Sequence, residues 1–343
     1  MTKRKPFERL SPLWLGLGIS GFFLLILLVT ETTLGRWSEV LVGGEFNALA
    51  DVSTGVLRDV RLAVVHCLAV GYLPAAFLHV MQSGRRTVYV LQEALDCTPE
   101  ECDALASSVS LKPSWLLVIG LLALTLSFLM PYLVPPVPPS PWNPSTWSPE
   151  VVWHRTLGPV TMVWAWWLGY AIFTVSMRMT SIAKKLNRID LFNISPLSPF
   201  TQQGLTNALL LIGAVSIWSL MLIETGFGQM MWLIGGTNLV MAIIAFISPV
   251  YGVHERIRQS KEKELGRITN EILKHRDSFQ RSDNSQHSGQ LADLVAYRGL
   301  IEAVSEWPFS TSTYTRIVLY TFLPPLTWGI GVIAEEIIGR MFL

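Results

Sequence analysis

Seven apolar segments without a single Asp, Glu, Lys or Arg constrain the fold of this 343-residue chain most strongly. Each is close to the length of about 20 residues that a helix needs to cross the hydrocarbon core of a bilayer. Charged residues make up 15% of the chain, against about 25% in soluble domains. The sequence therefore predicts an all-α, polytopic helical membrane protein with seven transmembrane helices. The spans are expected near residues 13–29, 62–81, 115–133, 159–177, 205–223 and 232–250, with the seventh inside 316–343.

Positive charge predicts the orientation of these spans. If the N-terminus lies in the cytoplasm, 21 of the 26 Lys and Arg residues fall in cytoplasmic segments. Membrane proteins carry such an excess on their cytoplasmic side. We therefore expect the N-terminus inside, the C-terminus outside, and a location in a cell membrane, which in a prokaryote is the inner membrane. The first apolar segment follows a basic stretch, as in a signal peptide, but residues 29–32 offer no small-residue cleavage site, so we expect a retained anchor.

The chain divides into three parts. Residues 1–251 form a membrane domain with the first six spans, residues 252–315 a cytoplasmic helical hairpin, and residues 316–343 the last transmembrane segment. In the hairpin, apolar residues recur at helical spacing between residues 253 and 279, leaving a charged opposite face. This apolar stripe must be covered, either by the second arm of the hairpin or by another copy of the chain. The sequence leaves both possibilities open.

Composition and motifs disfavour several classes of function. A net charge of +1 provides no strongly basic face, so we expect no nucleic-acid partner. The sequence has no recognisable catalytic motif, cofactor fingerprint or metal-ligand set, so we expect no enzymatic activity, no cofactor and no bound metal; His254-Glu255, for example, lacks the second histidine of a zinc-protease motif. Three cysteines offer no disulfide framework. We expect Cys97 and Cys102 to be reduced thiols in a cytoplasmic loop.

Polar side chains inside membrane spans are candidates for function because they are costly there. His66 and His79 lie 13 residues apart on the second span, which we expect to place them near one face of the helix. Either imidazole could gate a pathway or relay protons near neutral pH. The alternative is that each bonds to the backbone of a neighbouring helix. Asn207 and Asn238, on the fifth and sixth spans, are expected to form hydrogen bonds between helices.

The last apolar segment has an unusual sequence. Pro324 and Pro325 remove two backbone donors from the middle of the span, so the helix must kink or break there. Irregular backbone at membrane depth is tolerated where it packs in protein or lines water. Glu335 and Glu336 follow, at the expected outer edge of the membrane. Repeated around a symmetry axis, such acids would form an anionic ring of the kind that concentrates cations at a pore mouth.

These features favour an oligomeric, cation-preferring channel or channel-like conduit in a lipid bilayer, with a homo-oligomer as the expected assembly. The pore or gating candidates are Glu335, Glu336, Pro324, Pro325, His66 and His79. One alternative is a signalling or scaffold protein that acts through its cytoplasmic hairpin. Another is a small-molecule transporter, which the broken last span would suit but for which the chain lacks an evident internal repeat.

Overall fold

The computed structural model describes residues 11–35, 51–133, 149–186, 189–220, 228–279, 285–309, 315–316, 318–319 and 322. All regular secondary structure in these ranges is helical, which confirms the predicted all-α class. The helices are α1 (Pro12–Thr33), α3 (Asp51–Val90), α4 (Gln92–Leu95), α5 (Pro99–Ser108), α6 (Pro113–Leu133), α7 (Pro149–Ala183), the 3-10 turn η3 (Ser195–Leu197), α8 (Ser198–Ser219), α9 (Gly228–Phe279) and α10 (Ser285–Ala303).

Five segments within the described ranges are long and apolar enough to cross a membrane. They are Pro12–Thr33, Leu62–Val90, Pro99–Leu129, Val152–Ala183 and Leu239–Arg276. Helix α8, which holds the fifth predicted span, is not among them. Its first turns carry polar Thr201, Gln202 and Gln203, and its predicted end at Ile223 lies outside the described residues. Most of the seventh predicted span also lies outside them, so seven spans remain a prediction.

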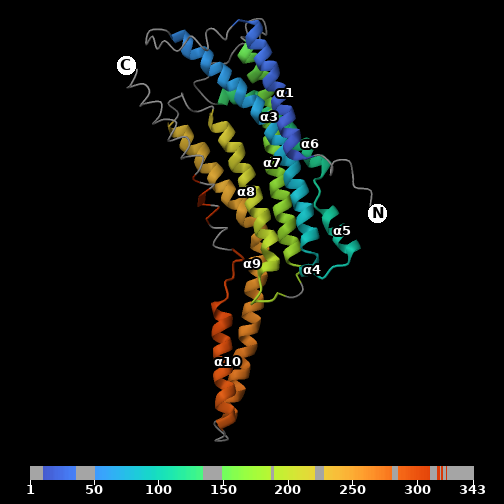
Figure 1. The fold of residues 1–343 in the computed structure, drawn as a ribbon, viewed down its shortest axis with the longest axis vertical. Coiled ribbons are helices and arrows are strands. Elements are labelled where there is room, and N and C mark those ends of the chain that lie inside the picture. Colours follow the sequence, from blue (N-terminus) through green and yellow to red (C-terminus); the bar gives the residue numbers. More distant parts are fainter. Residues whose placement is uncertain are drawn as a thin grey trace.

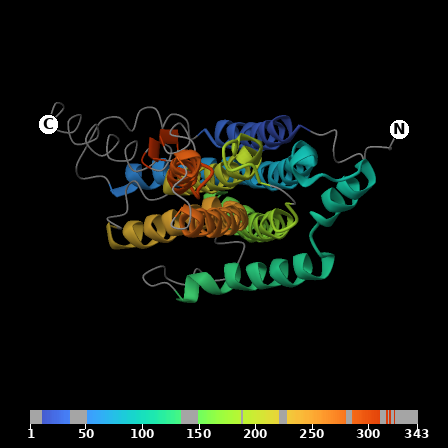
Figure 2. The same cartoon turned by 90° about the horizontal axis from the view of Figure 1, so that it is seen from below.

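The long helices pack side by side as a bundle in which successive helices run in alternating directions (Figure 1). Helices α3 and α7 pack against each other at its centre. Figure 2 shows α1 and α6 at opposite edges, where α1 packs on α3 and α6 on α7. Helix α8 packs on α3 and α9, which completes the bundle. The α4–α5 connection and the segment between α7 and α8 lie at the end of the bundle from which α9 projects (Figure 1). Assigning this end to the cytoplasm rests on the distribution of positive charge.

Apolar side chains fill the middle of the described bundle. Leu73 and Val80 of α3 are at most 1% exposed, as are Leu168, Val175 and Met179 of α7. Side chains packed to this degree leave no room for a water column between these two helices. The centre of the described bundle is therefore a closed core.

Helices α8 and α9 cross at close range. A Cβ atom added at Gly204 of α8 would collide with the backbone carbonyl of Phe246 in α9. Small residues permit such close approach of two helix backbones, and membrane proteins use them for that purpose. Gly204 therefore sets the distance between α8 and α9.

Helix α9 continues beyond the bundle as one arm of an antiparallel pair, and α10 returns along it (Figure 1). At 1.5 Å per residue, the part from Gly252 to Phe279 extends about 40 Å. Ile268 of α9 and Ile301 of α10 are fully buried. The apolar stripe of α9 is thus covered by α10 of the same chain, which was one of the two possibilities for its cover.

Candidate functional site

The four predicted pore residues of the last segment, Glu335, Glu336, Pro324 and Pro325, lie outside the described residues. The two histidines predicted as gating candidates both lie on α3 and can be placed. Four further features emerge from the structure: a buried polar row, a clamp at the base of the arm, an outward apolar face on α10, and a charged cavity beside α5.

His66 is a buried histidine. Its ring is 1% exposed, and its Nδ1 lies 2.7 Å from the carbonyl oxygen of Leu62, one turn earlier in the same helix. Because a carbonyl can only accept, Nδ1–H is the donor. Nε2 is buried, and no described residue forms a hydrogen bond with it. The rings of His154 and Trp218 lie 5.1 and 6.1 Å away, both edge to face. The expectation that His66 bonds to the backbone of a neighbouring helix is therefore wrong, because its hydrogen bond stays within α3.

His79 does not share the position of His66. Its side chain is exposed, whereas that of His66 is buried, so the expectation of a common face is wrong. Thirteen residues correspond to about 3.6 turns of helix, and the remaining 0.6 turn carries the second side chain well round to another side. The two imidazoles cannot form one relay on this helix. Within the described residues, no group of three or more His, Cys, Asp or Glu side chains could hold a metal ion.

A row of buried polar side chains ties α3, α8 and α7 together. Thr87 of α3 donates to Gln203 Oε1 at 3.2 Å, Gln203 Nε2 donates to Asn207 Oδ1 at 2.9 Å, and Asn207 Nδ2 donates to Ser176 Oγ of α7 at 3.2 Å. The predicted interhelical bond of Asn207 is thus present, and the row satisfies its amides. The other predicted amide, on Asn238, belongs to a side chain that the structure does not describe. The row is structural, since each donor named here has an acceptor.

Trp307, in the segment after α10, forms a clamp on the base of the arm. Its indole stacks on the imidazole of His254 in α9, with ring centroids 4.1 Å apart and planes 9° apart. Phe309 continues the stack towards Phe246 of α9, with centroids 5.1 Å apart. Thr201 of α8 donates to the carbonyl of Pro308 at 3.1 Å. The chain that leads towards the last segment is therefore fixed to both α8 and α9.

Lys261 of α9 fixes the end of α10 in the same region. Its ammonium donates to the carbonyls of Glu302 and Val304, both at 2.9 Å, and lies 3.8 Å from the Glu306 carboxylate. A cation at the C-terminal end of a helix satisfies free carbonyls and complements the helix dipole. In the sequence, Pro308 indicates only that a helix ends before it. The stacking of Trp307 and the role of Lys261 depend on tertiary contacts that no local pattern reveals.

Helix α10 carries an apolar face directed away from α9. Val295 and Leu300 are 53% and 59% exposed. At 100° per residue they lie about 140° apart around the helix, and four small exposed residues lie between them on this side. These are Ala292, Ala296, Gly299 and Ala303. A helix that is apolar on two opposite sides is usually covered on both. This second face, which we call the α10 outer face, has no cover within the described chain.

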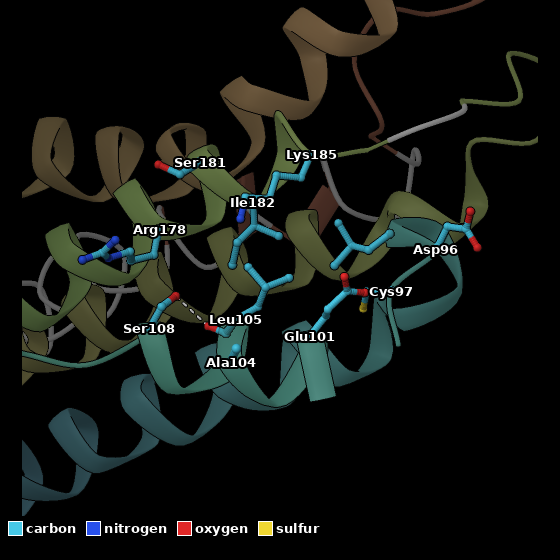
Figure 3. Close-up of a pocket in the computed structure, with 11 residues that line it drawn as sticks. Asp96, Cys97, Glu101, Ala104, Leu105, Ser108, Arg178, Ser181, Ile182 and Lys185 are labelled. Carbon is cyan, nitrogen blue, oxygen red and sulfur yellow. Dashed lines mark hydrogen bonds between the residues drawn. The ribbon is translucent and has the colours of Figure 1, made fainter. Parts of the chain in front are cut away.

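A cavity of about 590 Å³ lies between α5 and the end of α7 (Figure 3). Its lining includes Arg178 of α7, Lys185 just after α7, the acids Asp96 and Glu101, and Ser108. Figure 3 shows Arg178 and Ser108 towards one end and Asp96 and Glu101 towards the other. None of these residues was predicted as part of a site, because the cavity joins α5 to the end of α7 and no local pattern reveals that contact.

Cys97 and Cys102 form a disulfide beside this cavity, so the expectation of reduced thiols is wrong in the structure. Asp96 ends α4 in the left-handed conformation at φ 51°, which reverses the chain. Thr98 then begins α5 through a capping box with Glu101. These two devices bring the Cα atoms of the cysteines within 5.9 Å, a separation that a disulfide can bridge.

Comparison of the chain with models of protein families, with curated proteins and with solved structures finds no match.

Proposed function

We propose that the chain assembles into a homo-oligomer through the α10 outer face, and that this oligomer is a cation-preferring conduit. The observation that carries the assembly is the pair Val295 and Leu300, each more than half exposed on a helix whose other side is already packed on α9. The small residues between them suit close approach of an identical helix. A second copy of the chain is the natural occupant, because a face of this kind is complementary to itself in a symmetric pair.

The conduit is placed between copies of the chain, since α3 and α7 form a closed core within one copy. The clamp at Trp307 supports this placement. It fixes the chain entering the last segment to α8 and α9, so that arms held together by α10 would hold the last segments in register. Glu335 and Glu336 of each copy would then form the anionic ring at one mouth. Pro324 and Pro325 would supply the hinge.

Electrical recording of the full chain in a planar bilayer tests the conduit. We expect cation-selective currents, and we expect Glu335→Gln with Glu336→Gln to reduce the conductance most strongly at low salt, where screening is weak. The matched control is Glu93→Gln with Glu100→Gln, which removes two exposed acids elsewhere in the chain. The absence of current would contradict the proposed conduit. An unchanged conductance and reversal potential in the variant at residues 335 and 336 would contradict it as well.

The second candidate function is a membrane scaffold. The α10 outer face also favours it, because a partner protein could cover the same residues. A wild-type chain that is monomeric in detergent and in nanodiscs would favour the scaffold over the conduit.

A further inference from the structure

The cavity between α5 and α7 is lined by charges that do not neutralise one another. Arg178 and Lys185 contribute two cations, and Asp96 and Glu101 contribute two anions. Within the described part of the chain, none of these four side chains takes part in an ion pair. The Glu101 Oε2 atom is engaged by Thr98 in the capping box. All four side chains are exposed, and together they offer a ligand groups of both signs at one cavity.

The positive and negative groups are separated along the cavity. Figure 3 shows Arg178 at one end and the two acids at the other, with Lys185 between them at the upper edge. Arg178 lies in the last turns of α7, five residues before the helix ends at Ala183, and Lys185 follows the end of the helix. The candidate membrane span of α7 also ends at Ala183. Arg178 therefore lies nearer the middle of the membrane than Lys185 does, and the acids follow α4 at the far end.

The surroundings of the cavity are partly apolar. The buried side chain of Ile182 and the half-buried side chain of Leu105 contribute to its wall. Directly after α5 the chain enters α6, where Leu117 and Leu121 are exposed along one flank of the bundle. A ligand with a charged head and a long apolar tail could place its head in the cavity and its tail beside α6.

We infer that this cavity binds the headgroup of a phosphatidylethanolamine-type phospholipid. Its phosphate would meet the Arg178 guanidinium, whose planar fork suits two phosphate oxygens. Its ammonium would meet Asp96 and Glu101. The order of charges along the cavity agrees with the order in the headgroup, because in this lipid the phosphate lies nearer the membrane and the ammonium nearer water. Basic pockets between membrane helices are known to hold lipid headgroups, and the two acids select a zwitterionic headgroup over an anionic one.

The test uses the purified full chain in detergent and native mass spectrometry, with phosphatidylethanolamine, phosphatidylcholine and phosphatidylglycerol of identical acyl chains as probes. We expect the wild type to retain phosphatidylethanolamine best, by about threefold for each exposed charge pair gained. Phosphatidylcholine should bind less because its quaternary ammonium has no N–H donor, and phosphatidylglycerol less because it has no cation.

Two double variants separate the ends of the headgroup. Asp96→Asn with Glu101→Gln should abolish the preference for phosphatidylethanolamine over phosphatidylglycerol. A Gln at position 101 can still form the capping box with Thr98. Arg178→Gln with Lys185→Gln should weaken the retention of all three lipids. The matched control is Lys184→Gln, one residue from Lys185 and outside the lining of this cavity. It should behave as the wild type. Equal melting temperatures of all variants without added lipid check that the fold is intact.

Several results would overturn the inference. The first is that the variant of the two acids still prefers phosphatidylethanolamine over phosphatidylglycerol. The second is that the variant of the two cations retains the lipids as well as the wild type does. The third is that the wild type binds the three lipids equally. Soluble phosphoethanolamine at millimolar concentration should not displace the lipid, because it lacks the tail. If it displaces the lipid completely, the occupant is a free zwitterion and the assignment to a membrane lipid is wrong.

Discussion

The imidazole of His254 and the indole of Trp307 lie nearly parallel, with centroids 4.1 Å apart, and connect two parts of the chain that are 53 residues apart. His254 Nδ1 also lies 3.2 Å from the backbone carbonyl of Glu306. This contact closes the loop that α9 and α10 form. It holds the start of the last segment at the base of the arm.

Replacing Trp307 by Ala should loosen the base of the arm. The variant loses the stack on His254 and the contact with Phe309, which should cost about 2 kcal/mol for a half-buried aromatic side chain. Hydrogen exchange of residues 298–309 should accelerate, while that of α3 stays unchanged. Trp115→Ala, at an exposed position on α6, serves as the control. Equal exchange in the wild type and the Trp307 variant would show that the stack does not hold the segment.

The buried polar row makes an asymmetric prediction for two neighbouring glutamines. Gln203 is buried and bonded to Thr87 and Asn207, whereas Gln202 is exposed. Gln203→Leu should lower the free energy of unfolding by about 1 kcal/mol, because it leaves polar partners unsatisfied in the bundle. Gln202→Leu should change it little. Thermal unfolding in detergent measures both, and equal effects of the two substitutions would contradict the row.

Tyr297 gives the arm a pH dependence. Burial, together with the hydrogen bond of 3.1 Å that its hydroxyl donates to Glu264, raises the pKa of Tyr297. A raised pKa of a phenol means that its contribution to stability is present below the unfolded pKa of about 10 and is lost as the pH rises through the folded pKa. The wild type should therefore lose more stability above pH 10 than Tyr297→Phe does. If the free energies of unfolding of the wild type and of Tyr297→Phe change with pH in parallel, the Tyr297 hydroxyl contributes nothing to this pH dependence.

The Cys97–Cys102 disulfide favours a location outside the cytoplasm for its loop, whereas the predicted orientation places this loop in the cytoplasm. Cytosolic thiols are normally kept reduced, yet the positive-charge rule assigns this loop to the cytoplasm. Reporter tags at residue 1 and after Leu343 should lie on opposite sides if seven spans are present. A tag in the arm should report the same side as the tag at residue 1. A periplasmic or extracellular signal from the arm would contradict the orientation and agree with the disulfide.

Much of the fold could be predicted from the sequence because membrane spans and amphipathic arms are local patterns. Apolar run length indicated α1, α3, α6, α7 and α9, and the helical spacing of apolar residues between 253 and 279 indicated the arm. Local patterns do not specify which side chains meet. The stacking of His254 on Trp307, the bonds from Lys261 and the disulfide of Cys97 each join residues through tertiary contacts. Helix geometry could have predicted the position of His79 relative to His66. The expectation of a common face was wrong because 13 residues do not complete a whole number of helix turns.

The mass of the solubilised full chain tests the proposed assembly through the α10 outer face most directly. Light scattering should give a multiple of the chain mass for the wild type, and Val295→Glu with Leu300→Glu should reduce it. Lys263→Glu is the matched control, because it makes the same change in net charge on the arm at an exposed position of α9. It should keep the wild-type mass. A monomeric wild type, or an oligomer whose mass the Val295 and Leu300 substitutions leave unchanged, would contradict assembly through α10.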